Sequence, residues 1–115
     1  MKNINQIRAR NAFNSVGKIK GGVNGGEVVK KIPPIIMNNG LLSALAFAHE
    51  NDGWKSVFVE AEKHLRDDDI DLLPSNEPLL QYLTEKADSQ ALKLITNEIL
   101  AWLEFLRRFT SKDDA

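Results

Sequence analysis

Apolar residues recur every three or four positions along most of this chain, which is the spacing of one face of an α-helix. The clearest stretches begin at Trp54 and at Leu92. Their predicted inward positions are Trp54, Val57, Phe58, Ala61 and Leu65 in the first, and Leu92, Ile95, Ile99, Trp102, Leu106 and Phe109 in the second. Strict alternation of apolar and polar residues is absent, so no strand is predicted. The pattern predicts an all-α protein, a compact bundle of five or six helices in a single domain over residues 1–115.

A shorter helix is predicted at the amino terminus, beginning near Asn3 or Asn5. Its predicted apolar stripe consists of Ala9, Ala12, Phe13 and Val16. Arg8 and Arg10 flank that stripe, so we expect both guanidinium groups to be available to a partner. Ile4 and Ile7 lie off the stripe, where they either cover a second surface or contact another subunit.

Residues 32–48 form an uncharged run in a chain in which 27% of residues are charged. The run is too short and too interrupted for a bilayer span, which needs roughly 20 mostly apolar residues. Pro33 and Pro34 predict a kinked or restarted helix, and Gly40 predicts a stop before the next one. Residues 41–48 are apolar on nearly every side, which predicts a helix in the middle of the bundle.

Five of the seven glycines fall in residues 17–26, together with Lys18 and Lys20. This stretch predicts a flexible loop that becomes ordered when a partner docks. It lacks the Gly-Lys-Ser/Thr ending of a phosphate-binding P-loop and follows a helix, which argues against a nucleotide site.

The net charge of −1 hides a division between the two parts of the chain. Residues 1–40 hold seven basic residues and one acid, whereas the remaining 75 hold eight basic residues and fifteen acids. This asymmetry favours a polyanion or an acidic partner surface at the front of the molecule, although an ordinary solvated face is the alternative. The cations predicted to contact the phosphates of such a polyanion are Arg8, Arg10, Lys18, Lys20, Lys30, Lys31, Arg107 and Arg108.

Little in the sequence indicates catalysis. The chain has no cysteine, which excludes thiol catalysis and zinc–thiolate sites and suits a reducing cytoplasm. We therefore predict no catalytic residue, no metal and no cofactor. The alternative is a metal-dependent nuclease that uses His49, His64 and the 67–71 acidic cluster. Trp54 and Trp102 lie on apolar stripes, so they are predicted to be core residues and not surfaces for base stacking.

Three blocks carry a family resemblance. They are Gln6-Ile-Arg-Ala-Arg-Asn-Ala12, Lys31-Ile-Pro33 leading to Asn39-Gly-Leu-Leu-Ser-Ala-Leu-Ala-Phe47, and Ile99-Leu-Ala-Trp-Leu-Glu-Phe-Leu-Arg-Arg-Phe109. In order, spacing and total length the chain resembles the small subunit of the type III-B (Cmr) CRISPR effector complex. Pro34 and the glycine-rich loop depart from that family's pattern.

The resemblance implies an all-helical, non-enzymatic, cytoplasmic subunit that works in antiviral defence, and it makes the eight cations named above the predicted RNA-binding residues. Its implied partners are the other subunits of the Cmr complex, guide RNA and target RNA, and copies of itself stacked in a short filament, with no membrane. A helical adaptor that binds only proteins is the rival interpretation from another functional class.

Overall fold

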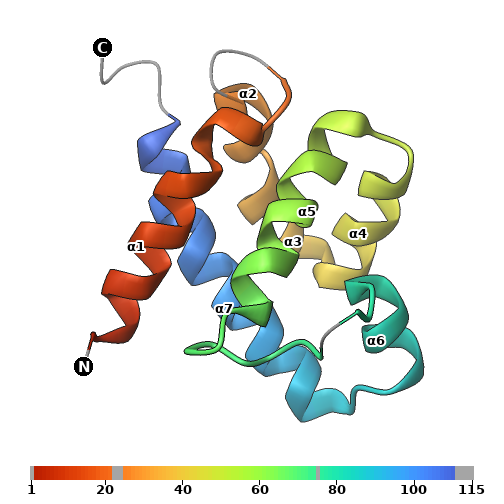
Figure 1. Cartoon of the computed structure of the whole chain (residues 1–115). Helices are drawn as coiled ribbons and strands as arrows, with labels where there is room; N and C mark the ends of the chain where they lie inside the picture. The colour runs from red at the N-terminus through yellow and green to blue at the C-terminus, as the bar shows by residue number, and fades with distance from the viewer. Residues whose placement is uncertain (1, 22–24, 75, 111–115) are drawn as a thin grey trace.

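The computed structural model of the chain describes residues 2–21, 25–74 and 76–110. Within these ranges every regular element is helical, which confirms the predicted all-α class (Figure 1). The helices of seven or more residues are α1 (Ile4–Ser15), α3 (Ile32–Asn39), α4 (Leu41–His49), α5 (Asp52–Arg66), α6 (Leu79–Glu85) and α7 (Ser89–Phe109). Two short turns, the 3₁₀ turn η1 (Val16–Lys18) and α2 (Gly26–Val29), connect α1 to α3.

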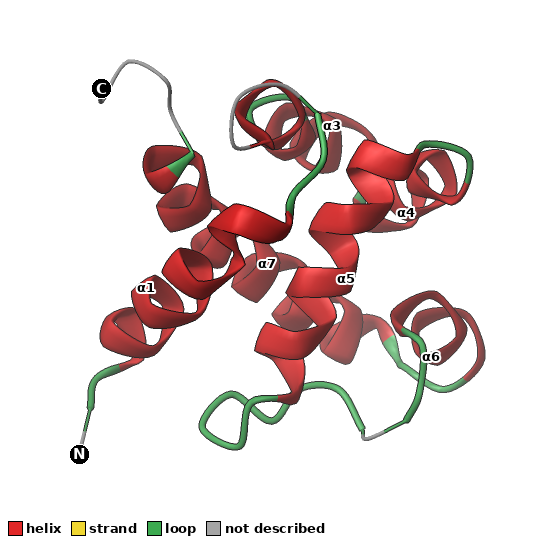
Figure 2. Ribbon diagram, turned by 45° about the horizontal axis from the view of Figure 1, so that its top comes forward, coloured by secondary structure: helices red, strands yellow, loops and turns green. Residues whose placement is uncertain are grey.

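Helix α7 is the longest element, and α1 and α5 pack against it (Figure 2). The carboxyl ends of α1 and α7, the amino end of α5, and the turns η1 and α2 gather at one end of the molecule (Figure 1). We call this end the η1–α2 pole. The opposite end, which we call the connector pole, contains residues 67–74 after α5 and residues 86–88 before α7. None of the described helices combines the length and apolar character that crossing a bilayer requires.

The strongest apolar stripes were predicted correctly except at the two ends of the second, where Leu92 is half-buried and Phe109 is 39% exposed. Trp54, Val57, Phe58, Ala61 and Leu65 are all buried, as are Ile95, Ile99, Trp102 and Leu106. Both tryptophans therefore belong to the core, as the sequence predicted.

Side-chain caps fix the beginnings of the three longest helices. Asn3 and Gln6 form a reciprocal capping box at α1, with bonds of 2.9 and 2.8 Å. Asn51 accepts from the Trp54 N–H at α5, and Asp88 accepts from the Ala91 N–H at α7. Asn3 is one of the two residues at which the sequence predicted the start of α1.

The uncharged run forms α3 and α4, separated at Gly40 with φ +90°. Pro33 and Pro34 occupy the first turn of α3, where no backbone N–H is needed, so the helix restarts there. The prediction that the second piece lies in the middle of the bundle is wrong. Leu42 and Phe47 on α4 are exposed, because α4 contacts α3, α5 and α6 on one side only, whereas α7 takes the central position.

The predicted stripe of α1 is only partly right, because Ala12 is buried and Ala9 and Val16 are half-buried, but Phe13 is not. Its buried residues are Ile7, Ala12 and Ser15, whereas the Phe13 side chain is 67% exposed and Ile4 is exposed as well. The inner face of α1 is partly polar, because Arg8, Asn11 and Ser15 hydrogen-bond to groups on α5 and α7. Hydrophobic periodicity does not detect a face of this composition.

The described ends of the glycine-rich segment are packed, and residues 22–24 lie outside the described residues. Ile19 is buried, and the Lys20 N–H donates to Ser56 Oγ at 3.0 Å. Gly25 has φ +78°, and a Cβ at this position would lie 2.1 Å from Ile19 Cγ2. The segment therefore needs glycine at residue 25 for both conformation and space.

We expect Gly25→Ala to lower the free energy of unfolding by about 2 kcal/mol, through the unfavourable φ and the displacement of Ile19. Urea unfolding followed by far-UV circular dichroism measures this. Gly17→Ala is the matched control, because a Cβ at Gly17 meets no atom within 4 Å. Equal stability of the two variants would contradict the account.

Candidate nucleic-acid interface and the polar seam behind it

A row of polar contacts joins the inner face of α1 and the segment that follows it to α5. The two helices are antiparallel, so residues later in α1 contact residues earlier in α5. The hydrogen bonds of this row join Arg10 to Asp67 (2.6 Å), Asn11 to His64 (2.9 Å), Ser15 to Glu60 (3.1 Å) and the Lys20 N–H to Ser56 (3.0 Å). We call this row, together with Arg8 and Glu98, the polar seam.

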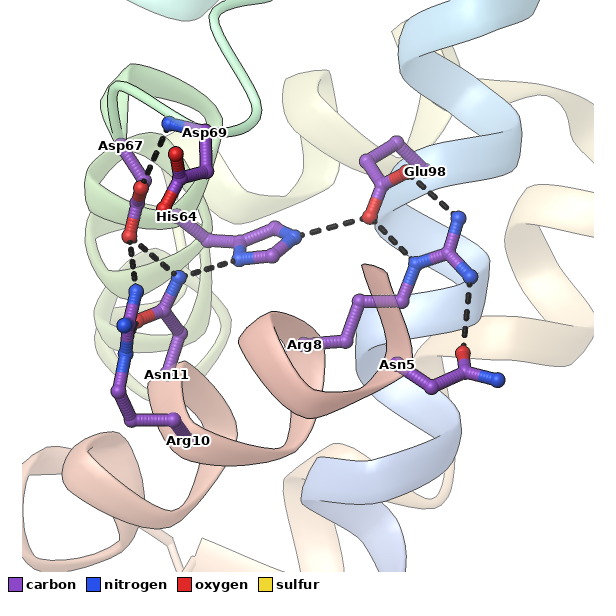
Figure 3. Close-up of polar contacts among 8 residues, drawn as sticks. All are labelled: Asn5, Arg8, Arg10, Asn11, His64, Asp67, Asp69 and Glu98. Carbon is purple, nitrogen blue, oxygen red and sulfur yellow. Dashed lines mark hydrogen bonds and ion pairs between the residues drawn. The ribbon is translucent and has the colours of Figure 1, made fainter. Parts of the chain in front are cut away.

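Arg8 and Glu98 form the most buried ion pair of the seam (Figure 3). Arg8 donates from Nε to Glu98 Oε2 at 2.7 Å and from Nη2 to Oε1 at 2.8 Å. Burial would raise the pKa of Glu98, but hydrogen bonds from Arg8 and His64 outweigh it and lower the pKa to about 2. The same hydrogen bond raises the pKa of Arg8. This pair joins α1 to α7.

His64 lies at the centre of the seam, 98% buried, with both ring nitrogens occupied. Asn11 donates from Nδ2 to the Asp67 carboxylate at 3.0 Å, which fixes the orientation of the amide. The second Nδ2 hydrogen then points to His64 Nδ1, so Nδ1 accepts and the proton resides on Nε2. His64 Nε2 in turn donates to Glu98 Oε2 at 3.0 Å.

Asp67 ends the seam near the connector pole. Burial would raise its pKa, but bonds from the Asp69 N–H, Asn11 and Arg10 outweigh it and lower the pKa. The carboxylate is therefore ionised at neutral pH and accepts hydrogen bonds only. Asp67 is engaged in holding α1.

The structure separates the eight predicted cations into two groups. Arg8 and Arg10 hold Glu98 and Asp67, which differs from the expectation that both were available to a partner. Arg107 and Arg108 both pair with Glu104 on the same helix, at 3.0 Å each. These four arginines are engaged within the chain.

The four lysines form the second group, and their residues are exposed. Among the described residues, no ion pair engages Lys18, Lys20 or Lys31, and Lys30 pairs with Glu27 at 3.3 Å. All four lie on η1, on α2 or directly beside them. Packing brings these segments together, since a Cβ on Gly53 would meet Val28 Cγ2 at 2.8 Å and Lys20 O at 2.9 Å.

The candidate metal site does not assemble. His49 is exposed at the end of α4, whereas His64 is buried in the seam. Among the described residues, no group of three or more histidine, aspartate or glutamate side chains is placed to hold a metal ion.

Sequence reasoning missed the seam. Glu60, His64 and Glu98 are buried polar residues whose contacts across the seam join positions 34 to 90 apart, which a local pattern cannot reveal. Glu60 pairs in addition with Lys63, three residues along α5. A weak signal existed in Asn11 and Ser15, which recur at helical spacing with Arg8. Polar residues at i, i+3 and i+7 lie on one face of a helix, so they can mark an inward face as apolar residues do.

Comparison with known proteins identifies the family. The family model described as CRISPR-associated protein (Cas_Cmr5) matches residues 4–112. No curated relative and no solved structure matches the chain. The chain therefore belongs to the Cas_Cmr5 family of CRISPR-associated proteins, the small subunits of type III-B (Cmr) complexes.

Proposed function

We propose that the chain is a non-catalytic subunit of the Cmr effector complex and helps to bind target RNA through its four exposed lysines. This RNA-binding set consists of Lys18, Lys20, Lys30 and Lys31. The observation that carries the proposal is their common exposure at the η1–α2 pole, in a stretch with Glu27 as its single acid. Such contacts reach phosphates and give affinity without sequence preference.

The engagement of the arginines supports a division of labour among the cations. Arg8 and Arg10 hold the seam together, and moving either to a phosphate would leave a carboxylate of the seam without its cation. Arg107 and Arg108 stand in the last turn of α7, where positive charge also complements the helix dipole. In this proposal the lysines bind RNA and the arginines maintain the fold.

The non-catalytic role draws support from the seam. A general base needs a ring nitrogen or carboxylate within reach of a substrate, yet His64 is buried with both nitrogens bonded. Asp67 is engaged by Arg10 and Asn11. Two of the residues that the nuclease alternative requires, His64 and Asp67, are thus used to hold helices together.

Stacking of copies along the guide-RNA backbone, in the cytoplasm, completes the proposal. The connector pole exposes Asp68, Asp69 and Asp71, whereas the opposite pole exposes the lysines. Unlike charges at opposite ends suit head-to-tail contact, which extends into a filament when the rotation does not close.

A protein-only adaptor remains the second candidate because α3 and α4 expose several large apolar side chains. These are Ile35, Met37, Leu42 and Phe47. Exposed apolar surface of this kind marks protein contacts more often than RNA contacts. The two candidates differ in what they predict for the lysines.

We expect Lys30→Glu/Lys31→Glu to weaken binding of a single-stranded RNA about tenfold, because two phosphate contacts are lost and replaced by repulsion. Fluorescence polarisation with a labelled RNA, repeated over a series of salt concentrations, measures this. The slope of log affinity against log salt should fall by roughly 1.4, at about 0.7 per phosphate.

Lys86→Glu/Lys93→Glu is the matched control, since it makes the same change in net charge at the connector pole and the start of α7. Equal RNA affinity of the two double variants would reject the lysine interface and favour the adaptor.

A further inference from the structure

Two phenylalanines form an exposed aromatic pair where α1 and α7 meet. The rings of Phe13 and Phe109 are 5.6 Å apart between centroids and inclined at 85°, so one presents its edge to the other. Phe13 is 67% exposed and Phe109 is 39% exposed. The two rings contact each other and yet leave much of their surface in water.

The core does not account for Phe13. The inner face of α1 is formed by Ile7, Ala12 and Ser15 together with the polar seam, and Phe13 lies outside it. Phe47, the other strongly exposed phenylalanine, differs because its ring packs on buried Trp54 at 4.5 Å. An exposed aromatic ring without a core partner indicates a binding surface.

The surroundings of the pair are cationic. Residues 4–18, which form α1 and η1, contain no acid, and Arg107 and Arg108, which directly precede Phe109, share a single acid, Glu104. The pair also lies at the same pole as the lysines. A Cβ on Gly26 would lie 2.6 Å from Thr110 O, so α2 abuts the residue after Phe109.

We propose that Phe13 and Phe109 form a base-stacking subsite for single-stranded RNA. This inference rests on the proposed RNA-binding function and adds to it a contact with bases. Aromatic rings bind unpaired bases through their π faces while neighbouring cations hold the backbone. Because the two rings meet edge to face, each restricts the orientations open to the other, which lowers the entropy cost of stacking.

RNA suits this surface better than a protein segment. The exposed apolar area consists of two rings, and it lies at the same pole as Lys18, Lys20 and Lys31, which no ion pair among the described residues engages. The apolar side chains of α3 and α4 provide a separate surface of the kind that protein partners use.

The test measures binding of the full chain to two RNAs of equal length, one intact and one with abasic positions. We expect Phe13→Ala to weaken binding to the intact RNA about fivefold or more, with an unchanged salt slope. Binding to the abasic RNA should not change, because its phosphates remain. Phe13→Tyr, which keeps an aromatic ring, should retain the wild-type affinity.

Phe47→Ala is the matched control, because it removes an exposed phenylalanine on another face. Equal losses for both RNAs would overturn the stacking subsite, as would a Phe13→Ala variant that binds both normally. If the lysine variant loses affinity while Phe13→Ala does not, the stacking inference fails and the proposed function stands. If the wild-type chain binds neither RNA at low salt, both fail.

Discussion

Glu98→Gln is expected to lower the free energy of unfolding by about 3 kcal/mol at pH 7. The carboxylate receives two hydrogen bonds from Arg8 and one from His64 while lying almost wholly out of solvent. The amide keeps the shape but removes the charge, so the Arg8 guanidinium loses its counter-ion in a partly buried position. The amide also turns an N–H₂ donor toward one of the existing donors.

The size of the effect follows from the pKa of Glu98, which falls from 4.5 to about 2 on folding. A pKa that is lower in the folded state means that the folded protein favours the ionised form. The corresponding stability is present above about pH 4.5 and is lost as the pH falls toward 2. A shift of this size corresponds to about 3 kcal/mol.

Urea unfolding of wild type and Glu98→Gln at several pH values between about 7 and 2 tests both statements. The difference between the two proteins should be largest at neutral pH and should shrink as the pH falls below about 4.5. Glu104→Gln is the control, because Glu104 lies on the same helix in an exposed pair and should cost less than about 1 kcal/mol. A difference between wild type and Glu98→Gln that does not depend on pH would contradict the assignment.

Helices that bury one apolar face could be predicted from the sequence. In α5 and α7 the buried residues recur at steps of three and four, and Asn51 and Asp88 mark the starts. Each of these signals is local, because periodicity and capping depend on neighbours within one or two turns. The position of α4 at the edge could not be predicted, since an apolar sequence does not specify which of its sides is covered.

The role of the arginines could not be predicted for a different reason. The distribution of charge along the sequence correctly shows where cations are concentrated. Which carboxylate each cation pairs with, however, depends on residues that folding brings near. Arg8 meets a carboxylate 90 positions away, and Arg10 meets one 57 positions away. The four lysines on or beside η1 and α2 stay exposed because folding places the acidic residues of the connector at the other pole, out of their reach.

Arg8→Glu is the second variant with a large expected effect, and it separates a structural arginine from the lysines of the proposed RNA-binding set. Two carboxylates would then face each other across α1 and α7, so the free energy of unfolding should fall by about 4 kcal/mol or more. RNA binding should be lost at the same time. Without a stability measurement, this loss would resemble the removal of a phosphate contact.

The charge swap Arg8→Glu/Glu98→Arg distinguishes the two causes. Exchanging the ions restores an attractive pair between α1 and α7, so part of the stability should return. The recovery is incomplete, because the Nε2–H of His64 then faces a guanidinium in place of its acceptor. If Arg8 serves only the fold, the swapped protein should bind RNA with wild-type affinity under conditions in which it is folded, whereas Lys30→Glu/Lys31→Glu keeps its stability and loses affinity. A swapped protein that folds but binds RNA as weakly as the lysine variant would place Arg8 in the interface.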